Sequence, residues 1–556
     1  MSSYKPTENE QLFSYTSGRW LWNEKQQLDA RFRHFNISSL KKLACEVIGS
    51  TRCISLEKIG EGNFNKAFRL VMQNSQNLIV KIPNPNAGPT RHTTASEVAT
   101  MEFGRTILNL PVPKVLAWSA TSQNPVESEY IIMEEAREFQ LHTVWPELEL
   151  RAKRDIIYQI VDIEKKMLSV SFDKWVRLWL MEPSYSAAYL TCLHRIGSLY
   201  FKDSGLSKCE PVKATAVSRE VEDGIESRFS IGPIVRREFW AGERSDMHHY
   251  HGPWKSVRQY LESIANREID WISRHAVPNK TTQNPWQYTS DAQNSWEAHV
   301  SSLRKFISVI PSIIPKDPDL SSPRFWHPDF HSGNIYVDDN GTISSIIDWQ
   351  GAWTAPLFIG ANPPMLLDYS IEMMMKLPDN FKQLDQTTKD LLRYQVAQSI
   401  LIHSYETRTA KENPLMHKMM RHPHGKTLKQ LEAFANATWD NYLFPFRECL
   451  VRMRRQVSGG SSTQWGNFDV DGPCPYQFSD EEIRKHQEEG AAFNESQEFW
   501  ESVGNIVSDE GYTATEDFGR AFKLFRRLRE EGLTGLHGEE RERFEKHTRW
   551  AVDNET

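Results

Sequence analysis

The spacing of hydrophobic residues predicts a helix near the N-terminus and then a sheet. Residues 26–49 carry apolar positions at helical intervals and end at Gly49, a residue type that often terminates helices. From Ile54 the period shortens, and apolar runs separated by glycines and by the polar turn 74–77 predict three antiparallel strands. The pattern therefore changes from helix to sheet between Gly49 and Ile54.

A helix and two further strands are predicted to complete this sheet. Residues 93–108 begin with Thr and Ser side chains, which favour helix N-termini, and then show helical spacing. Residues 112–120 and 128–136 carry the apolar runs that are typical of strands. We therefore expect a five-stranded sheet accompanied by one helix.

The rest of the chain is mostly helical in pattern. Helical spacing extends from about Glu147 to Arg324, with a loop-rich patch near 200–252, and it returns over 386–455. Met373 to Met375 are interpreted as core filling at the start of a helix. The predicted units are an N-terminal helical extension (1–53), a sheet-containing lobe (54–136), a mainly helical lobe (137–456), and a turn-rich linker with a charged helical tail (457–556).

Composition indicates a folded protein and excludes several functional classes. The chain has 556 residues, of which 39% are hydrophobic, enough to bury a deep cleft. The 66 basic and 73 acidic residues are mixed, which argues against nucleic-acid or membrane-surface binding. Six cysteines without a C-x-x-C pair predict reduced thiols and no disulfide framework. With no apolar signal, no Arg-rich presequence and no membrane-spanning run, we expect a cytoplasmic protein without a membrane span.

The stretch IGEGNFNKAFRL, residues 59–70, is a candidate phosphate-binding loop. Gly60 and Gly62 lack a Cβ, so their backbone amides can approach phosphate oxygens closely. Ordinary tight hairpins share this spacing, and Asn65 replaces the third glycine of the fuller nucleotide pattern.

Lys81 strengthens the nucleotide interpretation. It ends the apolar strand LIVKIP, so its ammonium should project from a sheet face and need a carboxylate partner. Glu97, on the helix that follows, is the expected partner, because Glu102 lies on another helix face. Surface lysines and glutamates are common, but the order of glycine loop, strand lysine and helix glutamate favours a functional pair.

The stretch HPDFHSGN, which begins at His327, has the residue types of a catalytic loop. Asp329 can accept a hydroxyl proton, Asn334 can ligate magnesium five residues later, and Asp348 adds a carboxylate at a strand's end. We group His327 with Asp329 and expect it to orient the loop through hydrogen bonds.

Three other polar clusters have simpler interpretations. Zinc is the rival ligand for His327 and His331, but Pro328 and Gly333 indicate a loop, and no Cys or third His accompanies them. The acids of VDDNGT are expected to solvate a hairpin turn. Three histidines between 248 and 251 are interpreted as loop packing.

FWHPDFHSGNI followed by IIDW resembles the aminoglycoside phosphotransferase-like family, which includes the choline kinases. The resemblance covers roughly residues 54–370 and implies an α+β, protein-kinase-like two-lobed fold with a small sheet-containing N-lobe and a large mainly helical C-lobe. It further implies these site roles: Gly60, Gly62 and Asn65 in the nucleotide loop, Lys81 on phosphate, Glu97 as its ion-pair partner, Glu134 at the adenine hinge, Asp329 as catalytic base, and Asn334 and Asp348 as magnesium ligands.

Motifs such as TSGRWLWNE and WAGERSDMHHYHGPW are similar to a fungal group named for altered inheritance of mitochondria, so mitochondrial residence is the alternative to a cytoplasmic one. The implied function is ATP- and magnesium-dependent transfer of the γ-phosphate to a hydroxyl of a small molecule. Trp349-Gln350 replace Phe-Gly, and Ala355-Pro356 precede leucine, so a peptide-docking surface is not indicated. The alternatives are a nucleotide-binding pseudokinase or assembly factor, and an atypical protein kinase.

Overall fold

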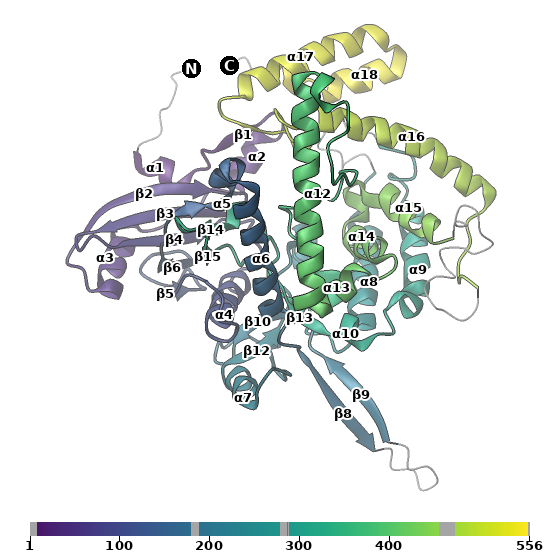
Figure 1. Ribbon diagram of the computed structural model, residues 1–556. Helices are drawn as coiled ribbons and strands as arrows, with labels where there is room; N and C mark the ends of the chain where they lie inside the picture. Colours follow the sequence, from purple (N-terminus) through teal and green to yellow (C-terminus); the bar gives the residue numbers. More distant parts are fainter. Residues whose placement is uncertain (1–7, 180–187, 279–285, 287–288, 455–472, 554–556) are drawn as a thin grey trace.

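The computed structural model describes residues 8–179, 188–278, 286, 289–454 and 473–553, and it has two lobes (Figure 1). A small lobe contains the main sheet, and a larger lobe is mostly helical. This is the expected α+β, two-lobed arrangement. Most of the predicted linker, residues 457–472, lies outside the described residues.

The small lobe is built on a five-stranded antiparallel sheet of order β2-β3-β4-β6-β5. The strands are β2 (Cys53–Glu61), β3 (Asn65–Met72), β4 (Asn77–Pro83), β5 (Val115–Ser119) and β6 (Tyr130–Glu134). In β4 the side chains of Leu78, Val80 and Ile82 enter one core, so the alternation of a strand sends Lys81 to the opposite face. The predicted five strands are confirmed.

Two helices cover the two faces of this sheet. Helix α3 (Ile37–Ile48) inserts Leu40 and Ala44 into the core with Leu78, Val80 and Ile82. Helix α4 (His92–Thr106) is almost wholly buried, because it lies between the sheet and the strands of the larger lobe. Lys81 therefore points toward α4, which carries Glu97.

The single helix predicted over 26–49 is wrong in one respect, because the structure contains two helices there. Helix α2 (Glu24–Asp29) ends early, and α3 begins only after Asn36. The Asn36 side chain accepts a hydrogen bond from the Ser39 N–H and so starts a new helix. Gly49, at φ 68°, ends α3 as predicted.

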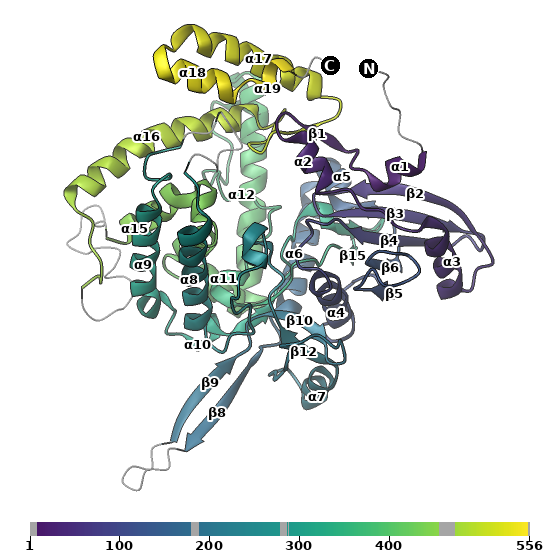
Figure 2. The same cartoon turned by 180° about the vertical axis from the view of Figure 1, so that it is seen from behind.

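Strands also interrupt the region from 147 to 324, which was predicted to be mostly helical. They are β8 (Asp173–Trp179), β9 (Ala188–His194), β10 (Ser198–Phe201), β11 (Glu210–Pro211) and β12 (Phe229–Gly232), with α7 (Arg219–Arg228) between the last two. Strands β10, β11 and β12 form a small sheet against α4, whereas the β8–β9 hairpin stands away from the body (Figures 1 and 2). The three strands β10 to β12 span two to four residues each, too short to give a pattern over a window.

The helical lobe packs its long helices in pairs. Its longer helices are α6 (Leu150–Met167), α8 (Val257–His275), α9 (Trp296–Ile313), α12 (Gln386–Glu412), α14 (Gly425–Ala435) and α15 (Leu443–Arg454); the shorter ones are α5 (Leu141–Val144), α10 (Pro318–Ser321), α11 (Leu357–Gly360) and α13 (Pro414–Met420). Helix α8 packs along α9, and α6 packs along α12. A continuous apolar core joins these helices to α4 and to the strands below the sheet.

Short strands flank the polar motifs between the lobes. They are β7 (Phe139–Gln140), β13 (Pro323–Phe325), β14 (Ile335–Val337), β15 (Ile343–Ile346) and β16 (Thr354–Pro356). The β14–β15 turn is the predicted hairpin, in which Asp338 accepts from the N–H groups of Asn340 and Thr342.

The two ends of the chain meet in one small sheet. Strand β1 (Gly18–Trp20) pairs with β17 (Tyr512–Ala514), far away in sequence. The neighbouring elements are α1 (Glu8–Phe13), α16 (Asp480–Val503), α17 (Phe518–Gly535), α18 (Gly538–His547) and α19 (Trp550–Asp553). Helices α1 and α19, the first and last described elements, both lie in the upper half of the view in Figure 2.

The interpretation of Met373 to Met375 as core filling is wrong. Met373 and Met375 are about half exposed, and they lie in a loop before α12 begins at Gln386. Apolar residue type alone did not reveal that this segment lies over the surface of α12, where the Met374 N–H bonds to the Ser399 hydroxyl.

Among the described residues, no helix is long and apolar enough to cross a membrane.

Candidate active site

Lys81 is the centre of an ion-pair cluster between the lobes. Its Nζ lies 2.6 Å from Glu97 Oε1 and 2.7 Å from Asp348 Oδ1. The predicted Lys81–Glu97 pair is therefore present, while Glu102 instead bonds to Arg105 and Arg228. The cluster joins β4, α4 and the segment after β15.

The two carboxylates set the charge of the lysine. Burial opposes its charged form, but Asp348 and Glu97 outweigh burial and raise the pKa of Lys81 above its usual value. The Lys81 ammonium lowers the pKa of Asp348. Burial raises the pKa of Glu97, with Lys81 acting in the opposite direction. Lys81 is thus a fixed cation held by one buried and one accessible acid.

Asp348 has the conformation of a residue under functional constraint. Its φ of 61° is rare for a residue with a side chain, and its side chain keeps 43% of its surface exposed. The preceding Ile347 N–H donates to the Asn334 carbonyl at 3.0 Å. The backbone therefore fixes Asp348 beside the loop that carries Asn334.

Asp329 and Asn334 are held together within one tight loop. The Asn334 side-chain Nδ2 donates to the Asp329 carbonyl at 2.9 Å, and it lies 3.2 Å from His331 Nε2. These contacts anchor the amide nitrogen and leave the amide oxygen for another partner. The Asp329 side chain is 56% exposed, so its carboxylate can reach a molecule from solvent.

His327 positions this loop through hydrogen bonds of both ring nitrogens. It is buried, its Nε2 lies 2.9 Å from the Ile347 carbonyl, and its Nδ1 accepts from the Asp329 N–H at 3.1 Å. Burial lowers the pKa of His327 to about 4, so the ring is neutral and donates from Nε2. Both ring nitrogens are used, which is incompatible with zinc ligation and makes His327 a positioning residue.

The glycine loop connects β2 to β3 above this cluster. A Cβ at Gly62 would meet no protein atom within 4 Å, and one at Gly60 would meet only Ala67 at 3.9 Å. Neither glycine has a positive φ. Protein packing and backbone strain therefore do not explain these glycines, whereas a ligand that approaches the backbone would.

Gln350 is a bridging residue that sequence reasoning did not identify. Its Oε1 accepts a hydrogen bond from Asn65 Nδ2, and its Nε2 donates to the Ala87 carbonyl at 3.0 Å. It thereby ties the glycine loop and the segment after β4 to the Asp348 segment. Its place two residues after Asp348 was the one available signal.

Glu134 lies at the end of β6, where the resemblance implies the hinge. Its N–H donates to the Lys114 carbonyl, and its carboxylate accepts from the Lys114 N–H at 3.2 Å. The Glu134 N–H and carboxylate are thus already paired with Lys114. A purine would therefore have to bond to backbone groups that follow Glu134.

The donor set fits magnesium better than a protein-bound transition metal. Among the described residues, no group of three or more His, Cys, Asp or Glu side chains could hold a metal ion. Magnesium commonly takes one or two protein carboxylate or carbonyl ligands and completes its shell with phosphate and water. Asn334 and Asp348 are the candidates for such a pair. His251 stacks on Trp240 at 3.9 Å, as expected for loop packing.

Comparisons with known proteins find one matching family profile and fungal relatives that align over most of the chain. A profile of the Phosphotransferase enzyme family matches residues 261–358. A subtelomeric hrmA-associated cluster protein of Aspergillus fumigatus is 31% identical over 86% of this chain and 92% of its own length. Altered inheritance of mitochondria protein 9 (mitochondrial) of Saccharomyces cerevisiae is 23% identical over 86% of this chain and 83% of its own.

Solved structures with a similar chain path include two aminoglycoside phosphotransferases. The crystal structure of APH(4)-Ia has 15% identity and a TM-score of 0.34, covering 74% of this chain and 99% of its own. A streptomycin–ATP ternary complex of APH(2")-IIa has 11% identity and a TM-score of 0.35, and the match covers 74% of this chain and 96% of that chain.

Proposed function

Because this chain belongs to the phosphotransferase enzyme family, in the fungal group that includes altered inheritance of mitochondria protein 9, we propose that it transfers the γ-phosphate of ATP to a hydroxyl of a small molecule. The observation that carries the proposal is the cluster of Lys81, Glu97 and Asp348 beside the Asp329–Asn334 loop. The proposal takes Lys81 as the phosphate-binding cation, Asn334 and Asp348 as the metal ligands and Asp329 as the base.

Binding of the nucleotide would use the small lobe. The glycine loop presents Gly60 and Gly62 to the phosphates, with Asn65 closing the loop, and Lys81 adds a positive charge below them. Glu97 keeps Lys81 oriented through its 2.6 Å contact. Magnesium, held by Asn334 and Asp348, would supply charge neutralisation on the phosphate oxygens.

Asp329 would align the acceptor and take its proton. As the acceptor oxygen bonds to the γ-phosphorus, the bond from phosphorus to the ADP oxygen breaks, and the hydroxyl proton passes to the Asp329 carboxylate. His327 holds the Asp329 backbone N–H and so fixes where the carboxylate points. Catalysis of this kind depends mainly on positioning and charge.

ATP consumption by the purified protein tests the proposal. We expect slow consumption alone and faster consumption when the small-molecule fraction of a cell extract is added. A nucleotide-binding protein without turnover would bind MgATP but show neither rate. An atypical protein kinase would respond to the protein fraction of the extract instead.

We also propose mitochondrial residence, in place of the cytoplasmic expectation. The Saccharomyces cerevisiae and Candida albicans relatives are named mitochondrial proteins, and both align over most of this chain. Fractionation of cells that express the natural gene with a C-terminal tag tests this. Recovery of the tag with the cytosolic marker would contradict it.

A further inference from the structure

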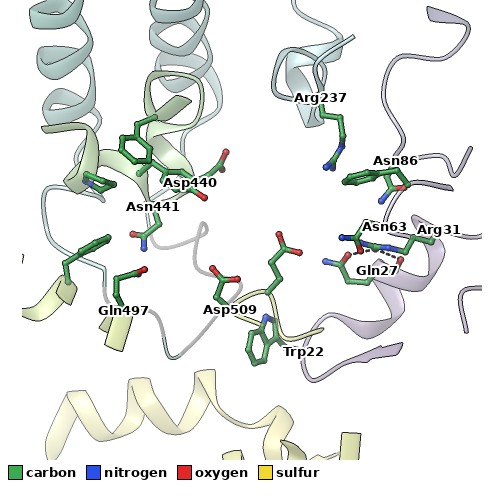
Figure 3. Close-up of a pocket in the computed structure, with 16 residues that line it drawn as sticks. Trp22, Gln27, Arg31, Asn63, Asn86, Arg237, Asp440, Asn441, Gln497 and Asp509 are labelled. Carbon is green, nitrogen blue, oxygen red and sulfur yellow. Dashed lines mark hydrogen bonds between the residues drawn. The ribbon is translucent and has the colours of Figure 1, made fainter. Parts of the chain in front are cut away.

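A polar cavity of about 740 Å³ lies between the two lobes and the two chain ends, and Figure 3 shows it in close-up. One wall is the glycine-loop tip, Asn63 and Phe64, together with Asn86, which follows β4. The opposite wall includes Asp440 and Asn441 of the helical lobe. The cavity therefore adjoins the loop to which we assign the phosphates.

Short connections link this cavity to the candidate active site. Phe64 is followed by Asn65, which bonds to Gln350, and Gln350 stands two residues after Asp348. Asn84, three residues after Lys81, accepts from the buried Lys66 ammonium at 2.7 Å, and its N–H donates to the Phe64 carbonyl. A molecule in the cavity would thus contact the outer end of the phosphate-binding loop.

The ends of the chain form the outer wall. Trp20 of β1 pairs with Tyr512 of β17, and the Leu21 N–H donates to the Gly511 carbonyl at 2.9 Å. Gly511, at φ 83°, lies so close to the Trp22 ring that a Cβ would approach it to 2.7 Å. This tight junction places Trp22 and Glu510 together in the cavity lining.

The outer wall is also attached to the glycine loop. Glu61, between Gly60 and Gly62, accepts from the Thr16 N–H at 2.6 Å and from the Ser17 N–H at 3.2 Å. The buried Lys66 ammonium also bonds to the Arg31 carbonyl. The N-terminal extension therefore holds the loop in place.

Several polar groups of the cavity have no protein partner. The Arg31 Nε and the Asn86 Oδ1 have no hydrogen-bond partner, but the protein covers both atoms, so neither faces a molecule in the cavity. The Asp440 carboxylate has no hydrogen-bond donor among the described residues, and Figure 3 shows it pointing inward. Asn441, at φ 69°, lies in a kink of the chain that turns both residues toward the cavity.

The charges of the side chains that line the cavity nearly balance. Three carboxylates, Asp440, Asp509 and Glu510, face two guanidinium groups, Arg31 and Arg237. A hydroxyl group both donates and accepts, so a compound rich in hydroxyls can bond to the Asp440 carboxylate as well as to the Arg237 guanidinium. A polycation or a polyanion would find no matching excess of charge.

We infer that this cavity is the acceptor site and that it selects a small, uncharged polyhydroxyl compound, with both chain ends forming its outer wall. The inference rests on the proposed phosphotransfer. Neither Asp329 nor Asn334 occurs among the described residues that line the cavity, so the reacting hydroxyl must extend past Phe64 to the catalytic loop.

Binding and turnover with a fixed panel of probes test the inference. The panel is sorbitol, myo-inositol, glucose and sucrose, with the polycation streptomycin and glucose 6-phosphate for comparison. We expect at least one neutral polyol to give a binding signal in saturation-transfer NMR and to increase the rate of ADP formation. Streptomycin and glucose 6-phosphate should do neither.

Two variants from different elements locate the binding. Asp440→Leu and Glu510→Leu should each weaken polyol binding about tenfold or more, as expected for a lost hydrogen bond to a charged group. Asp379→Leu is the matched control, because Asp379 is exposed and lies outside the lining. If one cavity variant fails to fold, the other still decides.

The outcomes separate this inference from the proposed function. Binding of MgATP without binding of any neutral polyol would overturn the acceptor site and leave phosphotransfer intact. Polyol binding that both cavity variants leave unchanged would also overturn it. Failure to bind MgATP, together with polyol binding that the variants weaken, would overturn phosphotransfer while keeping the cavity as a polyol site.

Discussion

At the scale of single residues, Asp329 and Asp348 differ because their surroundings differ. Asp348 lies against the Lys81 ammonium, which lowers its pKa and keeps it ionised for a cation. Within the described part of the chain, Asp329 forms no ion pair with a lysine or arginine, and its exposed carboxylate lies 3.4 Å from His331. The first arrangement suits a metal ligand, and the second suits a group that receives a proton.

Asp329→Asn should lower turnover by at least ~100-fold, the lower bound for a positioned general base. The amide keeps the shape of the side chain, and the shorter contacts to His327 and Asn334 run through the Asp329 backbone, with the carboxylate adding only a 3.5 Å contact to Asn334 Nδ2. MgATP affinity and the melting temperature should therefore change little. Turnover, affinity and melting temperature of one mutant separate the roles. Asp338→Asn, in the β14–β15 turn, is the control for turnover.

Asp348→Asn should weaken nucleotide binding chiefly when magnesium is present, because it removes the anionic ligand. Calorimetry with magnesium and with a chelator measures the difference. We expect the wild type to lose affinity by about tenfold or more on chelation and the variant to lose far less. Equal metal dependence in both proteins would contradict the assignment.

The sequence predicted the polar residues of the site and one of its ion pairs, because these depend on residue type and local order. Lys81 and Glu97 are 16 residues apart and follow from strand and helix geometry. Gln350 was missed, since its partner Asn65 is 285 residues away and no local pattern encodes that contact. The unusual φ of Asp348 likewise depends on the folded surroundings.

At the scale of elements, the Lys81–Glu97 pair is a joint between β4 and α4. Both side chains are buried, so replacing Lys81 would leave Glu97 without a counter-charge, whereas replacing Glu97 would leave Lys81 paired with Asp348. The sheet and its helix were predictable from periodicity, whereas the strands β10 to β12 were not, because each of them spans at most four residues. Helix α3 starts late because Asn36 caps it, a local signal that the longer apolar period obscured.

Lys81→Met should destabilise the protein by about 3 kcal/mol or more, because it leaves the buried Glu97 without a counter-charge. Denaturant unfolding measures this. The double variant Lys81→Met with Glu97→Gln should recover part of the loss, whereas nucleotide binding should stay impaired in both. No difference in stability between the single and double variants would contradict the buried pair.

Acid should weaken α9 packing through His299. Burial lowers the pKa of His299 to about 4, while an unfolded histidine titrates near about 6.5. The stability contributed by the neutral ring is therefore complete above about pH 6.5 and is lost as the pH falls toward 4. The melting temperature should fall less steeply over this range in His299→Gln than in the wild type, with exposed His142→Gln as the control.

At the scale of the whole molecule, the chain ends are part of one structure with the lobes. Strand β1 meets β17, and Glu61 of the glycine loop accepts from the N–H groups of Thr16 and Ser17. A sheet formed from residues about 500 positions apart leaves no local trace, so the sequence showed a helical extension and a charged tail but not their contact. This contact couples the tail to the loop that would cover the nucleotide.

Transfer of a labelled γ-phosphate tests the central claim most directly. Purified protein, magnesium and labelled ATP are incubated with the small-molecule fraction of a cell extract, and products are resolved by chromatography and 31P NMR. We predict a new phosphate monoester that forms only with magnesium and falls at least ~100-fold with Asp329→Asn. Binding of MgATP without any labelled monoester, or an undiminished yield with Asp329→Asn, would contradict the account.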